Sequence, residues 1–495
     1  MKTKKLLSLA LIFSAFCVNV MAVVDTFEYP ARNGSDDDDY TLTSKWFFSA
    51  KGGNYDAGSA LAADGMIRCM VEKDGNLLFA DRTNHEILVI NGQTGQTVKR
   101  IKLADSWRDY APTGTFHLNC IKKDAKGNVL IANLTTDALQ TFRVGKVNLT
   151  TGAVDVIVNC RIEDFFPGAL NRFDLFGVYG DVDTDAVIYA STSQHDAISL
   201  KGNCVYRWKV HAGIAGEPEW IPAILTEKGF ASNGGGLASN SWGFASNIFP
   251  MGEDVFYVSA QGIYPTLFQV VANDDDDLEA RVVDAFYDLS KENTPIISAY
   301  YDEITEPGKK HGMNTTYSSL AKFKIGDEYF LVLPAYNYVD PGDTNPEKVL
   351  SNFRLFKFRD ADQRFAEMEV LWTFPIGGFG KITNNISYST DIAVSVSANV
   401  ATIYLYVNQA GYAAYEFTAP KKNSVKNLSI SGLTISGADK AIQFSEAVAS
   451  AQVFSVTGQL IAKGDGASIA VSPGIYVVKA IALNGEAVVA KVVVE

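Results

Sequence analysis

Short apolar runs separated by turn residues recur along most of the chain. The stretch DGNLLFADRTNHEILVINGQTGQTVKR, residues 74–100, opens on an Asp-Gly turn and contains three such runs. Apolar runs of this length, bounded by glycine, asparagine and aspartate, are typical of antiparallel strands joined by tight turns. We therefore expect a meander of short strands here.

The first run of this stretch returns five more times. Each return is a turn followed by a run of β-branched and aromatic residues. The six runs end at Ala80, Ala132, Ala190, Ala260, Ala335 and Asn408. Strand content recurs while the connectors vary in length, which is typical of a radial repeat of four-stranded units. The sequence predicts an all-β fold built on a six-bladed β-propeller, with five or seven blades as the alternatives.

The sixth unit lacks an outer strand, because PKKNS at 420–424 interrupts the chain after its third strand. The segment TLTSKWFFS, residues 41–49, is a strand without a unit of its own, ahead of the first repeat. We expect this N-terminal strand to complete the sixth blade and close the ring, since closure hides the open sheet edge.

Connections on the two sides of the expected propeller differ in length. Turns between first and second strands, and between third and fourth strands, are short. The other connections are long, at 104–115, 163–176, 227–246, 295–317, 334–352 and 377–387. Long loops on one side of a rigid scaffold are common places for binding sites. We call this the long-loop side.

The long-loop side carries aromatic, amide, histidine and arginine side chains. Flat aromatic rings suit the apolar face of a sugar, and amide and guanidinium groups suit its hydroxyls. The residues expected to bind a ligand are Asp81, Arg82, Trp107, His117, Arg172, His195, Trp242, Gln261, Tyr264, His311, Tyr336, Asn337 and Gln409. For any single one of them, packing between loops is the competing interpretation.

No local motif identifies a reaction. The chain contains no G-x-S-x-G, H-E-x-x-H, G-x-x-x-x-G-K-[ST] or C-x-x-C. If the protein is an enzyme, the candidate acid and base groups are Asp81, His117, His195, Asp196 and His311. The run DVDTD at 181–185 alternates carboxylates like a calcium loop, but no glycine or distal glutamate follows. We expect a hairpin turn there, with calcium as the alternative, and no other metal or cofactor.

Residues 1–22 have the features of a secretory signal: three lysines, an apolar stretch at 6–18 and a small-residue cleavage site. That stretch is too short to remain across a bilayer, and no later segment is apolar for long enough to span one. The formal net charge of −13 argues against nucleic acid as a partner. We expect an exported protein in the periplasm, on the outer surface or outside the cell.

Removal of the signal leaves four cysteines, at positions 69, 120, 160 and 204. An even number in an oxidising compartment permits two disulfides, in three connectivities among which the sequence does not choose.

The character of the sequence changes after PKKNSVKN. Residues 428–495 form a series of short strands that includes VFSVTGQLI at 453–461, PGIYVVKA at 473–480 and AKVVVE at 490–495. In order and spacing these segments resemble the C-terminal sorting domains of type IX secretion, although the Asn-Pro that often opens such domains is absent. The resemblance implies a small β-sandwich that engages the secretion machinery. Residues 65–99 also resemble a group of secreted proteins of unknown function from the same bacteria.

The predicted organisation is a signal peptide (1–22), an exposed acidic leader (23–40), the propeller (41–420), a linker (421–427) and the C-terminal sandwich (428–495). We expect a secreted or surface protein that binds an extracellular glycan or another small ligand on the long-loop side. A propeller-type polysaccharide lyase or hydrolase is one alternative, and a scaffold for other proteins is a second.

Overall fold

The structure is a computed structural model of the 495-residue chain. It describes residues 27–28, 40–49, 67–108, 116–136, 139–168, 172–192, 203–224, 246–260, 263–286, 311–313, 319–338, 349–375, 379, 390–420, 433–485 and 487–494. The chain divides into two compact units, Met1–Ala419 and Pro420–Glu495.

The first sheet of the large unit shows how the sequence determines the strands. Its strands, paired antiparallel in this order, are β3 (Ile67–Lys73), β4 (Asn76–Asp81), β5 (Glu86–Asn91) and β6 (Thr97–Lys102). Asp74 and Gly75 join the first two strands with φ of +50° and +76°. Two positive φ values give the turn that matches the twist of paired strands, and Asp-Gly favours it. The strands predicted for this stretch are therefore confirmed.

The second sheet repeats the first in detail. Its strands are β7 (Cys120–Lys123), β8 (Val129–Ala132), β9 (Phe142–Val147) and β10 (Val154–Cys160). In the first sheet, Asn91 accepts the N–H groups of the residues two, three and four positions later through its side-chain and main-chain oxygens. Asn148 accepts the same three bonds between β9 and β10. A repeated sequence thus forms a repeated turn.

The third and fourth sheets are continuous with each other. The third contains β11 (Phe176–Gly180), β12 (Asp185–Ser191), β13 (Cys204–His211), β14 (Ile214–Ala215) and β15 (Glu219–Ile224). The fourth contains β16 (Asn247–Pro250), β17 (Val255–Ala260), β18 (Ile263–Ala272) and β19 (Leu278–Ala285). Their outer strands β15 and β19 pair in parallel, with Ala223 opposite Ala280. The sequence pattern does not predict this pairing, because it joins two separate repeats.

The fifth sheet gains two short strands from distant parts of the chain. Its main strands are β21 (Ala321–Ile325), β22 (Glu328–Tyr338), β23 (Val349–Phe358) and β24 (Met368–Phe374). β20 (His311–Met313) pairs with the far half of β22, and β1 (Phe27–Glu28) pairs with the outer strand β24. Two residues of the predicted leader therefore belong to the sheet, because the edge of β24 offers unpaired backbone groups.

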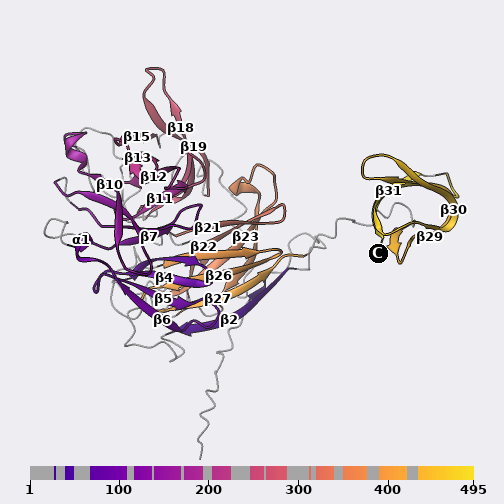
Figure 1. Cartoon of the computed structure of the whole chain (residues 1–495), viewed down its shortest axis with the longest axis horizontal. Helices are drawn as coiled ribbons and strands as arrows, with labels where there is room; N and C mark the ends of the chain where they lie inside the picture. The colour runs from indigo at the N-terminus through magenta and orange to yellow at the C-terminus, as the bar shows by residue number, and fades with distance from the viewer. Residues whose placement is uncertain are drawn as a thin grey trace, which may run out of the picture. The chain divides into compact units, whose positions relative to one another are not determined.

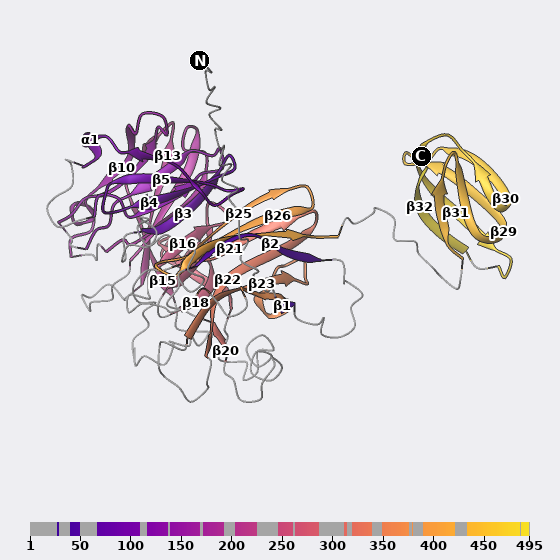
Figure 2. The same ribbon diagram turned by 90° about the horizontal axis from the view of Figure 1, so that it is seen from below.

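The sixth sheet takes its outer strand from the N-terminal part of the chain, as predicted. It contains β25 (Thr390–Ser397), β26 (Val400–Val407), β27 (Gly411–Thr418) and β2 (Thr41–Ser49). The pairing of β2 with β27 runs from Thr41 opposite Thr418 to Ser49 opposite Gly411. The indigo β2 lies beside the orange β26 and β27 (Figure 1 and Figure 2).

The first strands of most successive sheets are neighbours. β3 contacts both β25 and β7, and β11 contacts both β7 and β16. Apolar side chains fill the spaces between sheets: Trp46 and Tyr406 of the sixth sheet share a cluster with Phe79 of the first. The large unit is therefore all-β and propeller-like, as the repeat predicts.

Two predicted long loops contain regular structure. β22 continues to Tyr338 and β23 begins at Val349, so both ends of the predicted loop 334–352 are strand. The predicted loop 104–115 begins with α1 (Asp105–Arg108). The strand extension has a physical reason, since β20 supplies a partner that lies outside the local pattern. Within the described residues, no helix is long and apolar enough to cross a membrane.

The small unit is one five-stranded sheet, so the two-layer sandwich predicted for residues 428–495 is not confirmed. Its strands are β28 (Ile435–Ala438), β29 (Ala441–Ser455), β30 (Leu460–Ala470), β31 (Gly474–Ala482) and β32 (Ala487–Val494). A Cβ atom at Gly437 of β28 would lie 1.7 Å from the Val493 carbonyl oxygen of β32, so glycine lets these strands approach closely. The sheet curves around its own apolar core, which includes Ile442, Val478 and Val492.

Candidate functional site

The predicted ligand-binding residues differ in how much of them the structure describes. Side chains are described for Asp81, Arg82, Trp107, His117, Arg172 and Gln409. Strand position alone is described for Tyr264, and strand pairing alone for His311, Tyr336 and Asn337. His195, Trp242 and Gln261 lie outside the described residues, as does Asp196.

Asp81 ends β4 and fixes the turn that follows. One carboxylate oxygen accepts the N–H groups of Thr83 and Asn84, both at 3.1 Å. The other accepts the Asn84 amide at 2.9 Å and the Arg100 guanidinium at 3.0 Å. The residue is 1% exposed. The carboxylate is thus used within the protein, in the way Asp stabilises turns, and it positions the residues that follow it.

Arg82 and His85, in that turn, meet the chain just before β7. The Arg82 guanidinium carbon lies 3.5 Å from the centre of the Phe116 ring. Arg82 is 2% exposed, whereas Phe116 is 41% exposed. The rings of His85 and His117 meet edge to face with centroids 5.2 Å apart, and both residues are half-buried. We call Arg82, His85, Phe116 and His117 the Phe116 cluster.

Trp107 supports this cluster from inside the protein. It is 2% exposed, and its Nε1 donates to the His117 carbonyl at 2.8 Å. The Arg143 guanidinium carbon lies 4.6 Å from its ring centre. A Cβ atom at Gly145 would come within 2.9 Å of the indole, so the glycine makes room for the ring. Trp107 therefore holds the backbone of His117 in place, with its own faces covered by protein.

Arg172 belongs to the contact between the second and third sheets. Its Nε and Nη2 donate to the two carboxylate oxygens of Asp174 at 3.1 and 3.3 Å. The Asp174 side chain is 1% exposed, and the Asp174 carbonyl accepts the Asn119 amide from the segment before β7. A two-point contact of this kind fixes the plane of the guanidinium.

Three of the predicted residues lie on one pair of strands rather than on separate loops. His311 is the register partner of Asn337, and Gly312 is the partner of Tyr336. The prediction had placed these residues in two long loops, and the pairing of β20 with β22 corrects it. Tyr264 likewise lies within β18, and Gln409 lies in the turn between β26 and β27 with φ of +59°.

Buried hydroxyl groups join neighbouring sheets on the long-loop side. The hydroxyls of Ser191 and Ser246 lie 2.9 Å apart and link the third sheet to the fourth. Those of Ser319 and Thr390 lie 2.9 Å apart and link the fifth to the sixth. The packing interpretation thus accounts for the small polar residues at these strand ends.

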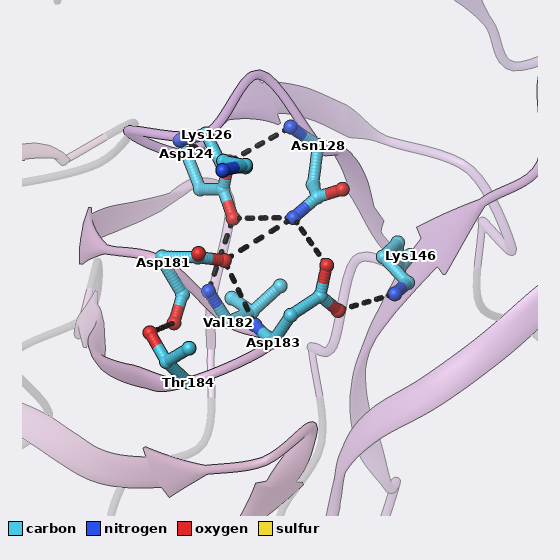
Figure 3. A network of polar contacts seen from close by, with 8 residues as sticks. All are labelled: Asp124, Lys126, Asn128, Lys146, Asp181, Val182, Asp183 and Thr184. Carbon is cyan, nitrogen blue, oxygen red and sulfur yellow. Dashed lines mark hydrogen bonds and ion pairs between the residues drawn. The ribbon is translucent and has the colours of Figure 1, made fainter.

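The acidic run 181–185 is the turn between β11 and β12, as predicted (Figure 3). The Asn128 amide of the second sheet lies 3.0 Å from carboxylate oxygens of both Asp124 and Asp183. Lys146 bonds to Asp183 and holds the pKa of that carboxyl below its usual value. The Asn128 amide and the Lys146 ammonium therefore bond to carboxylate oxygens, which are the kind of ligand that calcium binds. Among the described residues, no three His, Cys, Asp or Glu side chains are arranged to hold a metal.

Two members of the cluster, His85 and Phe116, are not among the predicted ligand-binding residues, and for Phe116 no sequence pattern indicates a role. It is a single aromatic residue ahead of β7, and its partner Arg82 belongs to the preceding repeat. The sequence feature that could have pointed to Phe116 was its position next to His117, on the predicted long-loop side.

The sequence matches no protein family and no curated protein. Among solved structures, the chain is similar to a DUF4623 family protein from Bacteroides eggerthii, with a TM-score of 0.48 and 14% identity over 80% of this chain and 78% of that one. It is also similar to a luciferin-regenerating enzyme, with a TM-score of 0.33 and 9% identity over 77% of this chain and 96% of that one. At these TM-scores neither likeness supports a function.

Proposed function

We propose that this protein is an exported binding protein whose ligand is a glycan, held on the long-loop side at the Phe116 cluster. The observation that supports this most directly is the Phe116 ring, which is 41% exposed and lies against a buried guanidinium. A cation on one face holds an aromatic ring in place. A ring that is already ordered loses little further freedom when it binds.

The cluster offers the two kinds of contact that a sugar requires. Phe116 provides apolar surface for the C–H groups of a pyranose ring. Beside it lie the half-buried imidazole rings of His85 and His117, and imidazole is a group that can both donate to and accept from hydroxyl groups when it is neutral. The cluster contains no carboxylate, and the net charge of the chain is −13, so a neutral glycan fits better than a strongly acidic one.

The scaffold of this site is proposed to be a closed six-bladed propeller, followed in the chain by the small five-stranded unit. Pairing of β2 with β27 and contact of β3 with β25 support closure between the last sheet and the first. The Trp46 indole adds a bond of 3.0 Å to the Gly92 carbonyl across the same junction. In such a ring, the Phe116 cluster lies between the first and second blades.

Export is proposed from the sequence. Residues 1–22 have the order of a secretory signal, and the unit beyond residue 427 resembles a sorting domain that secretion machinery recognises. The protein would then be located in the periplasm, on the outer surface or outside the cell.

The described part of the chain gives no specific support to the two alternative functions, a polysaccharide lyase or hydrolase and a scaffold for other proteins. Among the candidate acid and base groups of a lyase or hydrolase, Asp81 has both of its oxygens bonded within its own turn and to Arg100. For a protein-binding scaffold, no partner chemistry is indicated.

A glycan array, followed by calorimetry on the best glycan, tests the proposal. Phe116→Ala should weaken binding by about 10-fold or more, since about 1.4 kcal/mol of lost contact gives that factor. Joint replacement of His85 and His117 by alanine should weaken binding further. The melting temperature of Phe116→Ala should stay close to that of the wild type, because the ring is partly exposed.

Tyr179→Ala is the matched control. Tyr179 is an aromatic residue of similar exposure, 46%, and lies on β11 beside the acidic turn 181–185. Its replacement should leave the affinity unchanged. Absence of any glycan binding by the wild type, or equal affinity of Phe116→Ala and wild type, contradicts the proposal.

A further inference from the structure

Two thiols are in contact where the first sheet meets the second. The sulfur atoms of Cys69 and Cys120 lie 3.3 Å apart, although the residues are 51 positions apart in the sequence. The two residues are 1% and 0% exposed. Cys69 lies on β3 and Cys120 begins β7, so the contact joins the first strands of two sheets.

The backbone around Cys69 explains why its thiol faces the neighbouring sheet. The register of β3 with β4 shifts between Ile67 and Met70, so Cys69 lies in a β-bulge. A bulge redirects a side chain from the regular alternation of a strand. Asp391 of β25 stabilises the bulge, because its Oδ2 accepts the Met70 N–H at 2.7 Å.

The surroundings make the two thiols chemically unequal. Lys122 follows Cys120 by two residues and so lies on the same face of β7. Burial opposes ionisation of Cys120, but the hydrogen bond from Cys69 and the Lys122 ammonium outweigh burial and lower its pKa. Burial and the neighbouring thiol raise the pKa of Cys69 well above its usual value. In the folded protein Cys120 is therefore the more readily ionised of the two thiols.

The other two cysteines serve as an internal comparison. Cys204 lies 3.7 Å from the Thr192 hydroxyl, and Cys160, at the end of β10, belongs to an apolar cluster. Burial raises the pKa of both thiols, that of Cys160 to about 11. Among the contacts of the described residues, only Cys69 with Cys120 brings two sulfur atoms together.

We propose that Cys69 and Cys120 form a disulfide that joins the first sheet to the second. A disulfide bond is about 2.0 Å long, so the sulfur atoms must approach by about 1.3 Å, which small side-chain rotations provide. Two S–H bonds break and one S–S bond forms. The two electrons and two protons pass to a disulfide oxidant, such as oxidised glutathione or a disulfide-exchange protein, which becomes two thiols. Because the pair is buried, the exchange takes place while the chain folds. This proposal does not depend on the ligand proposed above.

Refolding the chain without its predicted signal, residues 23–495, from denaturant with oxidised and reduced glutathione tests the pairing. Free thiols are alkylated in denaturant, and peptides are mapped by mass spectrometry without reduction. We expect one linked pair of peptides that holds Cys69 and Cys120, with Cys160 and Cys204 alkylated. Alkylation of all four cysteines, or any link that includes Cys160 or Cys204, overturns the proposal.

Thermal unfolding distinguishes the stability that the crosslink adds from the stability that comes from packing of the two cysteine side chains. Oxidised wild type should melt at a higher temperature than the reduced protein, because a disulfide restricts the unfolded chain. Cys69→Ala and Cys120→Ala should lose this difference between oxidised and reduced samples. Cys204→Ala, which removes another buried thiol, should keep it. Equal melting temperatures for oxidised and reduced wild type would also overturn the proposal.

Discussion

Lys322 on β21 is surrounded by aromatic rings from three strands. Its ammonium nitrogen lies 5.4 Å from the ring centre of Tyr257, 5.7 Å from that of Tyr329 and 5.0 Å from that of Phe358. It also donates to the Tyr257 hydroxyl at 3.1 Å. Burial lowers the pKa of Lys322 to about 8, and the Asp284 carboxylate opposes this shift only in part. The folded protein therefore holds this proton less firmly than the unfolded chain does.

The stability of the wild type relative to Lys322→Met should rise with pH. Below about 8 both states carry the proton, and the folded state bears the cost of a half-buried charge. Between about 8 and the ordinary lysine value of 10.5, the unfolded state binds more protons, so the free energy of unfolding rises with pH. Urea unfolding at several pH values measures the difference. Lys324→Met, on the same strand, controls for loss of a charge, and a difference that does not vary with pH would refute the shift.

Side-chain environments of this kind could not be predicted, because their partners are distant in sequence. Asp391 accepts a bond from a residue 321 positions earlier, and no local pattern connects them. The turn at Asp81 is different, because that carboxylate bonds to residues two and three positions later. The repeat pattern placed both Arg82 and His117 on the same side of the expected propeller, the long-loop side. Phe116, which completes the cluster, has no such pattern.

At the scale of strands and turns, local sequence predicted most of the large unit. The Asp74–Gly75 turn and the turns at Asn91 and Asn148 are stabilised by bonds within themselves, so their residues indicate where strands end. β1 and β20 were missed, because they are two and three residues long and depend on edges supplied by other repeats. The strand ends at Tyr336 and Asn337 were missed for the same reason.

β2 should be necessary for the stability of the large unit. Trp46 is 7% exposed, packs on Tyr412 with ring centroids 5.4 Å apart and bonds to the first sheet. A chain that begins at residue 50 loses this contact and exposes the edge of β27. We expect it to aggregate or to lose at least about 3 kcal/mol in its free energy of unfolding, as for loss of a buried tryptophan. Denaturant unfolding and size-exclusion chromatography measure both outcomes.

A chain that begins at residue 40 is the control for this truncation. It keeps β2 and, of the described strands, loses only the two-residue β1, so its free energy of unfolding should be close to that of the full chain. Equal stability of the two truncated chains would mean that β2 is not needed.

At the scale of the whole molecule, the two units have separate cores. The core of the small unit contains residues from Leu433 to Val494, and the other clusters contain residues from Tyr40 to Ala419. The change in sequence character after residue 427 anticipated a second unit, since a new run of short strands begins there. The sequence did not indicate that the sheet of the small unit is curved, because this curvature depends on the close approach of Gly437 to Val493.

Limited digestion with trypsin should separate the two units. Lys421, Lys422 and Lys426 lie in sequence between β27, the last strand of the large unit, and β28, the first strand of the small unit. Because the cores share no residue, the fragment that ends near residue 420 should melt at the same temperature as the large unit does within the full chain. The fragment should also bind any ligand with the affinity of the full chain. Mass spectrometry identifies the cut, and circular dichroism follows unfolding. Unfolding of the isolated fragment would instead indicate one cooperative structure.

The pairing of Thr41 with Thr418 also sets the order of folding. The chain is synthesised, and would be exported, from its N-terminus, so β2 emerges first and has no partner until 411–418 follow. Joining ends so far apart costs chain entropy and is slow. The final sheet therefore forms after every other sheet has had time to assemble. Until then β2 stays without its partner strand, which would suit a chain that is exported, as proposed, before its synthesis is complete.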